Sequence, residues 1–414
     1  MMGLSMNPIL NRRLLLILGF VFIDLLGYSL ILPLLPFYAD NFAASLTTVG
    51  LLGTVNALAQ LIAAPTIGRL SDRFGRRPLL IFSIAGTVVA FLMLGFAQSL
   101  TMLFVSRIVD GLFGGNISLA RAYITDITDS KSRSRSLGLI GASFGLGFII
   151  GPAMGGILSQ FGFAVPAFAA AGLSLLNLIA VLIWLPESLP AEDRQDLRKS
   201  PHTAFSLKKL FEELAKPCVG PLLLMQLFYN LAFILFQTNF ALFAKTRLAL
   251  TAQSTSYILA YVGLLSVLVQ ALAIGRLTSL FKERTLIYYG SILMSISLFI
   301  WGFVGRVPML LIILAPIALS AGVLNTVTTS QLTQSVYRED VGGTLGLSAS
   351  LQSLAQILTP TIGGALMQFA GSWAVGVAAA IFMSVAVIIV RFQILPRPEQ
   401  EGPCPRQNET PMEA

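Results

Sequence analysis

Twelve long apolar segments, separated by short polar turns, are the feature that most limits how this chain can fold. Hydrophobic residues make up 55% of the 414 residues and charged residues only 11%, too few to cover the surface of a water-soluble protein of this length. The segments approach the roughly 20 residues that a helix needs to cross a bilayer. We therefore expect an all-α membrane protein with twelve transmembrane helices, at 13–38, 47–68, 78–98, 101–124, 134–160, 163–186, 217–244, 252–277, 285–305, 307–332, 341–368 and 372–395.

Residues suited to metal, thiol or nucleotide chemistry are scarce. The sole histidine, His202, lies in a polar connection, and Cys218 and Cys404 lack the spacing of metal ligands. The net charge of +8 is better explained by basic residues beside a membrane than by nucleic-acid binding. The sequence contains no Walker motif for ATP hydrolysis. We expect no metal, no cofactor and no nucleic-acid partner, and a membrane-embedded enzyme fits this residue set poorly.

The chain repeats itself at about half its length. The stretch from Gly275 to Arg284 matches the one from Gly68 to Arg77 at five of ten positions, and the pattern Pro-x-x-Gly-Gly at Pro152 returns at Pro360. This repeat predicts two parallel six-helix bundles related by an axis along the membrane normal. The predicted parts are an N-terminal bundle at 1–186, a cytoplasmic linker with an amphipathic helix at 187–216, a C-terminal bundle at 217–396 and a disordered tail at 397–414.

The distribution of basic residues predicts the orientation. If both termini face the cytoplasm, only Lys245, Arg247 and Arg306 of the 27 lysines and arginines fall in external loops, and Arg107 lies within a helix. Cytoplasmic loops of membrane proteins are enriched in lysine and arginine, and the opposite topology would reverse this bias. We expect a multi-pass protein of the plasma (inner) membrane with both termini in the cytoplasm, and we expect it to be a monomer.

Very few charged residues lie well inside the apolar segments, where a charge is costly and therefore a functional candidate. Asp24 is near the middle of 13–38, and Arg107 and Asp110 share one face of 101–124. Burial opposes ionisation of a carboxylate and a nearby guanidinium favours it, so an acid that alternates between such surroundings can bind and release a proton. We expect Asp24 to couple transport to protons with Arg107 as its partner. The alternative is a fixed neutral cluster, and Asp110 is either a proton or cation site or only a partner for Arg107.

The decapeptide GRLSDRFGRR, from Gly68 to Arg77, carries four arginines and one aspartate between two apolar segments. So many charges cannot cross a bilayer in a short turn, which places this stretch at the membrane surface. It resembles, position by position, the loop signature G-x-L-[SA]-D-R-x-G-R-R of the major facilitator superfamily. The resemblance implies a charge relay that docks against 341–368 when the carrier is open outward and comes apart as it opens inward. The residues implied in this conformational gating are Gly68, Asp72, Arg73, Gly75, Arg76, Arg77 and Asp126.

Other segments indicate which group within the superfamily the chain resembles. The glycine pattern in 134–160 resembles the antiporter signature of drug/proton exchangers within that superfamily, although close helix packing alone also uses glycine and proline. The pattern D-x-x-G-x5-P-x-x-P from Asp24 and the run RIVDGLFGGNISLARAYITDIT from Arg107 resemble tetracycline-type exporters. Two departures are Asp110, where a neutral residue is commoner in the family, and Arg121, an added charge. The antiporter-motif residues are Gly147, Gly151, Pro152, Gly155 and Gly156.

Aromatic and amide side chains are candidates for a substrate cavity between the two halves, because such a mixture suits a large, partly apolar ligand. For the aromatic residues simple packing is the favoured alternative, and for the amides helix-to-helix hydrogen bonds are equally open. The candidates are Asn56, Gln60, Phe144, Phe148, Phe228, Tyr229, Asn230, Phe233, Gln237, Tyr257, Tyr261, Asn325, Gln352 and Gln356.

The resemblance implies a secondary active transporter that exports a lipophilic small molecule or drug in exchange for protons, by alternating access. Its partners would be the small-molecule substrate, protons and the lipid bilayer. The runner-up is a uniporter or proton symporter for a metabolite or lipid within the same fold. A receptor or scaffold that binds a ligand without moving it is a third possibility.

Overall fold

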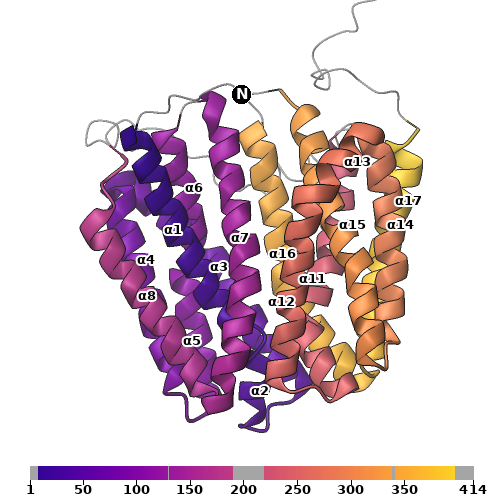
Figure 1. Cartoon of the computed structure of the whole chain (residues 1–414), viewed down its shortest axis with the longest axis horizontal. Helices are drawn as coiled ribbons and strands as arrows, with labels where there is room; N and C mark the ends of the chain where they lie inside the picture. Colours follow the sequence, from indigo (N-terminus) through magenta and orange to yellow (C-terminus); the bar gives the residue numbers. More distant parts are fainter. Residues whose placement is uncertain (1–7, 129, 190–218, 338–340, 397–414) are drawn as a thin grey trace, which may run out of the picture. The chain divides into compact units, whose positions relative to one another are not determined.

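The computed structural model describes residues 8–128, 130–189, 219–337 and 341–396, and in these ranges the chain is helical and contains no strand (Figure 1). The amphipathic helix predicted within 187–216 lies almost wholly outside the described residues, and so does the tail predicted to be disordered at 397–414.

Helices occupy all twelve predicted segments. The N-terminal half contains α1 (Pro8–Ile31), α2 (Leu35–Asp40), α3 (Leu46–Phe74), α4 (Arg76–Gly95), α5 (Leu100–Phe113), α6 (Asn116–Ile127), α7 (Ser130–Leu158) and α8 (Ala164–Trp184). The C-terminal half contains α11 (Gly220–Leu248), α12 (Ala252–Leu268), α13 (Ile274–Leu280), α14 (Glu283–Gly302), α15 (Val307–Gln334), α16 (Val341–Phe369) and α17 (Trp373–Ile389). In the described part of the chain eleven spans are long and apolar enough to cross a membrane, and α16 occupies the remaining predicted segment.

Two predicted spans are interrupted. The first is divided into α1 and α2 by a turn at 32–34, where Pro33 and Pro36 cannot donate the backbone hydrogen bonds of a continuous helix. The fourth is divided into α5 and α6 at Gly114 and Gly115, because glycine tolerates the change of backbone direction. The second break matters for function, since it makes Asn116 the first residue of α6.

The described helices form two compact units. The first holds the described residues up to 189 together with Asn239–Val267 and Pro360–Phe369, and the second holds the other described residues. Segments from α11, α12 and α16 thus pack with the N-terminal helices. The domain boundaries expected from the sequence repeat remain a prediction.

The core of the first unit lies among α1, α4, α6 and α8, with Ile17, Leu80, Ile84 and Tyr123 fully buried. In this unit α1 packs along α7, α8 and α6 (Figure 1). Burial of each such side chain stabilises the fold by about 1.5–3 kcal/mol in water, and less where the alternative is lipid. The helix in the middle of this packing, α1, is the one that carries Asp24.

In the second unit α14 packs against α15 and α17. A side chain at Gly302 would come within 2.7 Å of the backbone oxygen of Trp373, so α14 and α17 touch through their backbones. Large apolar side chains on other faces stay exposed, such as Tyr289 (64%) and, in the first unit, Ile183 (64%). Helices that are apolar on their exposed faces are expected in lipid.

Candidate functional site

Asp24 lies in the C-terminal half of α1 and faces α6. Its Oδ1 accepts a hydrogen bond of 2.6 Å from Nδ2 of Asn116. Nδ2 of Asn116 also lies 3.4 Å from Oγ1 of Thr87 on α4. Asn116 is only 4% exposed, so the carboxylate is linked to the packed interior of the first unit.

A second polar cluster joins α3 to α5. Nη1 of Arg107 lies 3.3 Å from Oδ2 of Asp110, and Nδ2 of Asn56 donates to the same carboxylate oxygen at 2.9 Å. The guanidinium lies over the ring of Phe91 at 5.8 Å. Both charged side chains are buried, and Nε and Nη2 of Arg107 have no hydrogen-bond partner.

In this conformation Asp24 is not paired with Arg107, and the role of Arg107 as its partner during the cycle stays a prediction. Arg107 is held by Asp110, three residues further along the same helix, because that spacing places both on one helical face. Asp24 is held instead by Asn116, which the break at Gly114 and Gly115 turns toward α1. Asn116 was missed by the sequence analysis; the only signal for it was a polar residue directly after two glycines in an apolar segment.

The two amides of α3 among the cavity candidates tie helices together in this structure, and their place in a cavity stays a prediction. Asn56 donates to the backbone oxygen of Arg107 at 3.0 Å, and Nε2 of Gln60 donates to that of Gly114 at 2.8 Å. A Cβ at Gly111 would collide with the backbone oxygen of Asn56, so α3 and α5 are in close contact. Asn56 and Gln60 therefore form the helix-to-helix hydrogen bonds that were the alternative interpretation of the buried amides.

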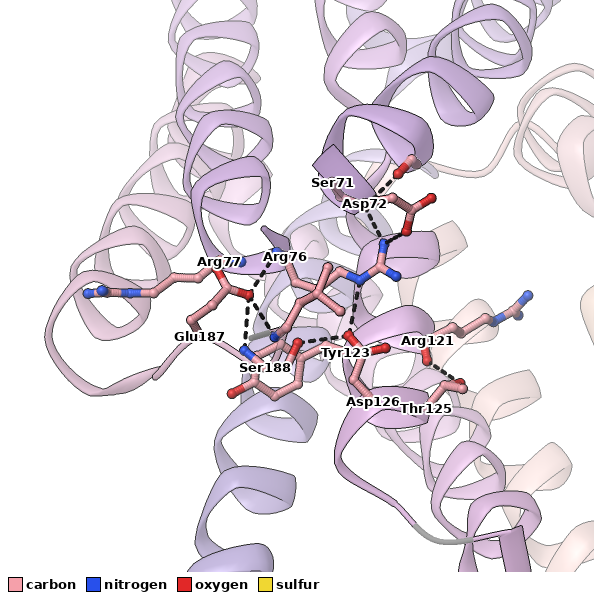
Figure 2. Close-up of polar contacts among 12 residues, drawn as sticks. Ser71, Asp72, Arg76, Arg77, Arg121, Tyr123, Thr125, Asp126, Glu187 and Ser188 are labelled. Atoms are coloured by element: carbon pink, nitrogen blue, oxygen red, sulfur yellow. Dashed lines mark hydrogen bonds and ion pairs between the residues drawn. The ribbon is translucent and has the colours of Figure 1, made fainter. Parts of the chain in front are cut away.

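The expected gating residues gather around Arg76, which begins α4 (Figure 2). Its Nη1 lies 2.5 Å from Oδ1 of Asp72 on α3, and its Nε lies 3.1 Å from Oδ2 of Asp126 on α6. Nη1 also donates to Oγ of Ser71 at 2.5 Å. One buried guanidinium therefore links three helices. Gly75, between α3 and α4, has φ 104°, a conformation that favours glycine.

The chain that follows α8 completes this cluster. Glu187 accepts from the backbone N–H groups of Arg76 at 2.9 Å and Arg77 at 3.2 Å, so its carboxylate caps the positive end of α4. Ser188 donates to Oδ2 of Asp126 at 2.9 Å. Figure 2 shows these side chains converging between the helices. Glu187 and Ser188 both lie in the linker predicted at 187–216, and the sequence pattern assigned neither of them a role.

Not every residue of the loop signature joins the cluster. Arg73 is exposed, with its guanidinium 5.3 Å from the ring of Phe74. A Cβ at Gly68 would meet no atom within 4 Å. Arg121, one of the two departures from the family pattern, extends away from the carboxylates in Figure 2. The gating roles of Arg73 and Gly68 stay predictions.

The glycines of α7 form the contact surface for α1. A Cβ at Gly147 would lie 3.2 Å from Cβ of Leu25, one at Gly151 would overlap Oγ of Ser29, and one at Gly155 would overlap the backbone oxygen of Leu30. Ser29 also donates to the backbone oxygen of Gly147 at 2.8 Å.

On the other side of α7, a Cβ at Gly156 would lie 2.7 Å from Cβ of Ser256 on α12. Within α7, Pro152 is buried. The glycines thus allow α7 to pack closely along the part of α1 that contains Asp24.

The remaining cavity candidates are divided between the two units, so a common cavity stays a prediction. In the first unit the rings of Phe144 and Phe148 are stacked at 5.5 Å, while Tyr257 is exposed and accepts from Nε2 of Gln253 at 3.0 Å. Tyr261 of this unit is partly buried.

In the second unit Tyr229 and Phe233 are stacked at 5.8 Å, and the Tyr229 hydroxyl donates to the backbone oxygen of Ala321 at 3.3 Å. Asn230 is buried. The partly buried members are Phe228, Gln237 and Gln356, and the exposed ones are Asn325 and Gln352.

A further ion pair lies at the end of the first unit opposite the loop signature. Oδ1 of Asp40 is 2.8 Å from Nζ of Lys245, and the carboxylate side chain is 60% exposed. Exposed pairs of this kind contribute about 0–1 kcal/mol. Asp40 is therefore a useful comparison for Asp24.

Comparisons with known proteins agree with this architecture. The sequence profile of the Major Facilitator Superfamily matches residues 17–273 and 222–411. Similar proteins include the class C tetracycline resistance protein of Escherichia coli, 32% identical over 89% of this chain and 94% of its own length. Multidrug resistance protein 2 of Bacillus subtilis (strain 168) is 30% identical over 84% of this chain and 87% of its own.

Among solved structures, a bacterial homolog of the human lysosomal transporter Spinster, in an inward-facing and occupied conformation, is similar with a TM-score of 0.75. It shares 16% sequence identity over 94% of this chain and 97% of that chain. At this identity the similarity shows the fold alone.

Proposed function

Because the chain belongs to the major facilitator superfamily, we propose that it is a secondary carrier that exports a lipophilic small molecule in exchange for protons by alternating access. Two similar proteins are named for resistance to tetracycline and to multiple drugs, which supports this substrate class. Proteins of this superfamily are generally carriers, and we propose that this chain likewise has no enzymatic activity. The distribution of its 27 basic residues supports cytoplasmic termini in the plasma membrane.

The observation that carries the proton-coupled part of the proposal is the partner of Asp24. In the described N-terminal half, Asp40, Asp72, Asp110 and Asp126 each lie in an ion pair with a lysine or arginine. An opposite charge at such a distance keeps a carboxylate ionised. Asp24 instead faces the neutral amide of Asn116, which does not hold it in the charged form as a neighbouring cation would.

Arg107 supports a second step of the proposed transport cycle, the release of the proton from Asp24. Its Nε and Nη2 are buried donors without a partner, and leaving such groups unpaired costs about 1–3 kcal/mol or more. A carboxylate that reached them in another conformation of the carrier would be driven to release its proton. We assign Arg107 this role toward Asp24, with Asp110 as the acid that holds Arg107 in the conformation described here.

The carrier itself is tested in proteoliposomes with an imposed pH gradient, with tetracycline and ethidium as probes. We expect one or both to accumulate against their concentration gradient while protons move the opposite way, and nigericin, which dissipates the pH gradient, to stop accumulation. Probe movement that nigericin does not change would indicate uniport. Accumulation of the probe in the direction of proton flow would indicate symport. If neither probe moves, the proposed drug efflux is contradicted.

Asp72→Asn is expected to slow turnover more than it weakens substrate binding. The change removes one of the two carboxylates that hold Arg76, a partly solvated network that can break and re-form in each cycle. The measurement is the initial efflux rate together with the affinity for ethidium in detergent. An unchanged rate would count against the gating role, and Asp40→Asn, which removes an ion pair outside the network, is the control.

A further inference from the structure

Asn116 lies between Asp24 on α1 and Thr87 on α4, and one end of its amide is satisfied while the other is not. Nδ2 donates to Asp24 and lies 3.4 Å from Thr87 Oγ1, whereas Oδ1 is buried and has no hydrogen-bond partner. A buried acceptor without a donor is unfavourable. An amide that served only to tie α6 to its neighbours would be expected to use both ends.

We propose that Asn116 is a positioning residue that holds Asp24 in both of its protonation states, by turning its amide over. When the carboxylate is charged, Nδ2 donates to it, as in the structure. When Asp24 has taken up a proton, its O–H donates to Oδ1 of the reversed amide. The proton comes from the aqueous phase and no covalent bond changes other than the O–H of Asp24. The inference rests on the proposed function only in making Asp24 the group that takes up the proton.

The geometry accommodates both orientations. The separation of 2.6 Å between Asp24 and the amide is short for an N–H···O bond and lies within the usual range for O–H···O. The two ends of an asparagine amide have nearly the same shape, so reversal needs no backbone movement. Because Asn116 begins α6 after Gly115, the position of its side chain is fixed by the helix start while its amide plane can rotate.

The hydroxyl group of Thr87 can form a hydrogen bond with Asn116 in either orientation of the amide. Its hydroxyl now donates to the backbone oxygen of Ser83 at 3.2 Å, which leaves Oγ1 free to accept from Nδ2 of Asn116. A hydroxyl both donates and accepts, so after reversal the same O–H can donate to Oδ1. The oxygen that has no partner in the present orientation would then have two, while Nδ2 would take the place that now offers Oδ1 none.

The charged groups around Asp24 do not provide an alternative partner. Asp110 on α5 is close enough to act on Asp24 electrostatically, and Arg107 beside it is paired with Asp110. On α1 the nearby titratable group is Tyr28. On α6 the ionisable groups are Arg121, Tyr123 and Asp126, the last paired with Arg76. Helix α8 contains no acid or base, and those of α4 and α7 occur only in the first two turns of each helix.

The test follows the protonation of Asp24 itself, by infrared difference spectra of the full-length protein in liposomes across a pH series. The carbonyl band of the protonated carboxyl group is assigned by its loss in Asp24→Asn. In Asn116→Leu, which keeps the branched shape without hydrogen bonds, we expect the midpoint of this band to move to higher pH by about one unit, a tenfold rise in proton affinity. The charged form loses a charge-assisted bond and the neutral form only an ordinary one.

Asn177→Leu is the matched control. Asn177 on α8 is equally buried and donates to the backbone oxygen of Phe20 on α1 at 3.1 Å, without touching the carboxylate. It should leave the midpoint unchanged although it removes an amide that ties α1. An unshifted midpoint in Asn116→Leu, or an equal shift in Asn177→Leu, would overturn the inference. Absence of an Asp24 band in the wild-type protein would overturn the proposed function instead.

Discussion

Replacing Asp24 with asparagine is expected to abolish proton-coupled efflux of tetracycline and ethidium while the protein still inserts and folds. Asparagine has nearly the shape of a protonated aspartate and can still bond to Asn116, but it cannot release a proton. The carrier should therefore lose accumulation against a gradient. It should keep downhill exchange of the probe, because the neutral side chain resembles one of the two states of the cycle.

The comparison for this variant is Asp40→Asn. Asp40 is also an aspartate of the first unit, but it is exposed and paired with Lys245 at 2.8 Å. Efflux in everted membrane vesicles, energised by an imposed pH gradient, should be close to wild type for Asp40→Asn and at the level of empty vesicles for Asp24→Asn. Full pH-gradient-driven efflux by Asp24→Asn would refute the assignment.

The second large effect is expected from Gly151→Val on α7. A Cβ at this position would overlap Oγ of Ser29 and lie 3.0 Å from the backbone oxygen of Leu26, so α1 and α7 must separate. Overpacking of this kind destabilises by about 1–3 kcal/mol. Because α1 carries Asp24, we also expect efflux to fall to the background of empty vesicles.

Gly141→Val provides the control on the same helix, because a Cβ at Gly141 meets no atom within 4 Å. Thermal unfolding of the purified proteins and efflux in vesicles should both separate the two variants, with Gly141→Val close to wild type. Equal losses in the two variants would mean that a valine anywhere on α7 is harmful and that contact with α1 is not the reason.

The helices could be predicted because a helix that crosses a bilayer needs a continuous apolar run, and such a run is a local property of the sequence. A run of about 20 apolar residues is visible without knowledge of any neighbour, and so is the charged turn from Gly68 to Arg77. The residue contacts within that turn were partly predictable. The grouping of Asp72, Arg76 and Asp126 followed from the family resemblance, whereas the cap that Glu187 gives to α4 depends on where the chain leaves α8.

The partner of Asp24 could not be predicted, and the reason is geometric. Asp24 and Arg107 are opposite charges within the first and fourth apolar segments, so pairing them was the simplest expectation. The turn at Gly114 and Gly115 redirects the chain and brings Asn116 to α1, while Asp110 is already within reach of Arg107 on its own helix. Periodicity within one helix does not reveal which side chain a break will place against another.

The most direct test of the account measures protons released when substrate binds. Purified carrier in a weakly buffered solution with a pH indicator is mixed with tetracycline or ethidium, whichever the transport assay has shown to be moved. We expect proton release by the wild-type protein and by Asp40→Asn, and none by Asp24→Asn at the same occupancy of the binding site. Equal proton release by Asp24→Asn would show that another group carries the proton and would contradict the account.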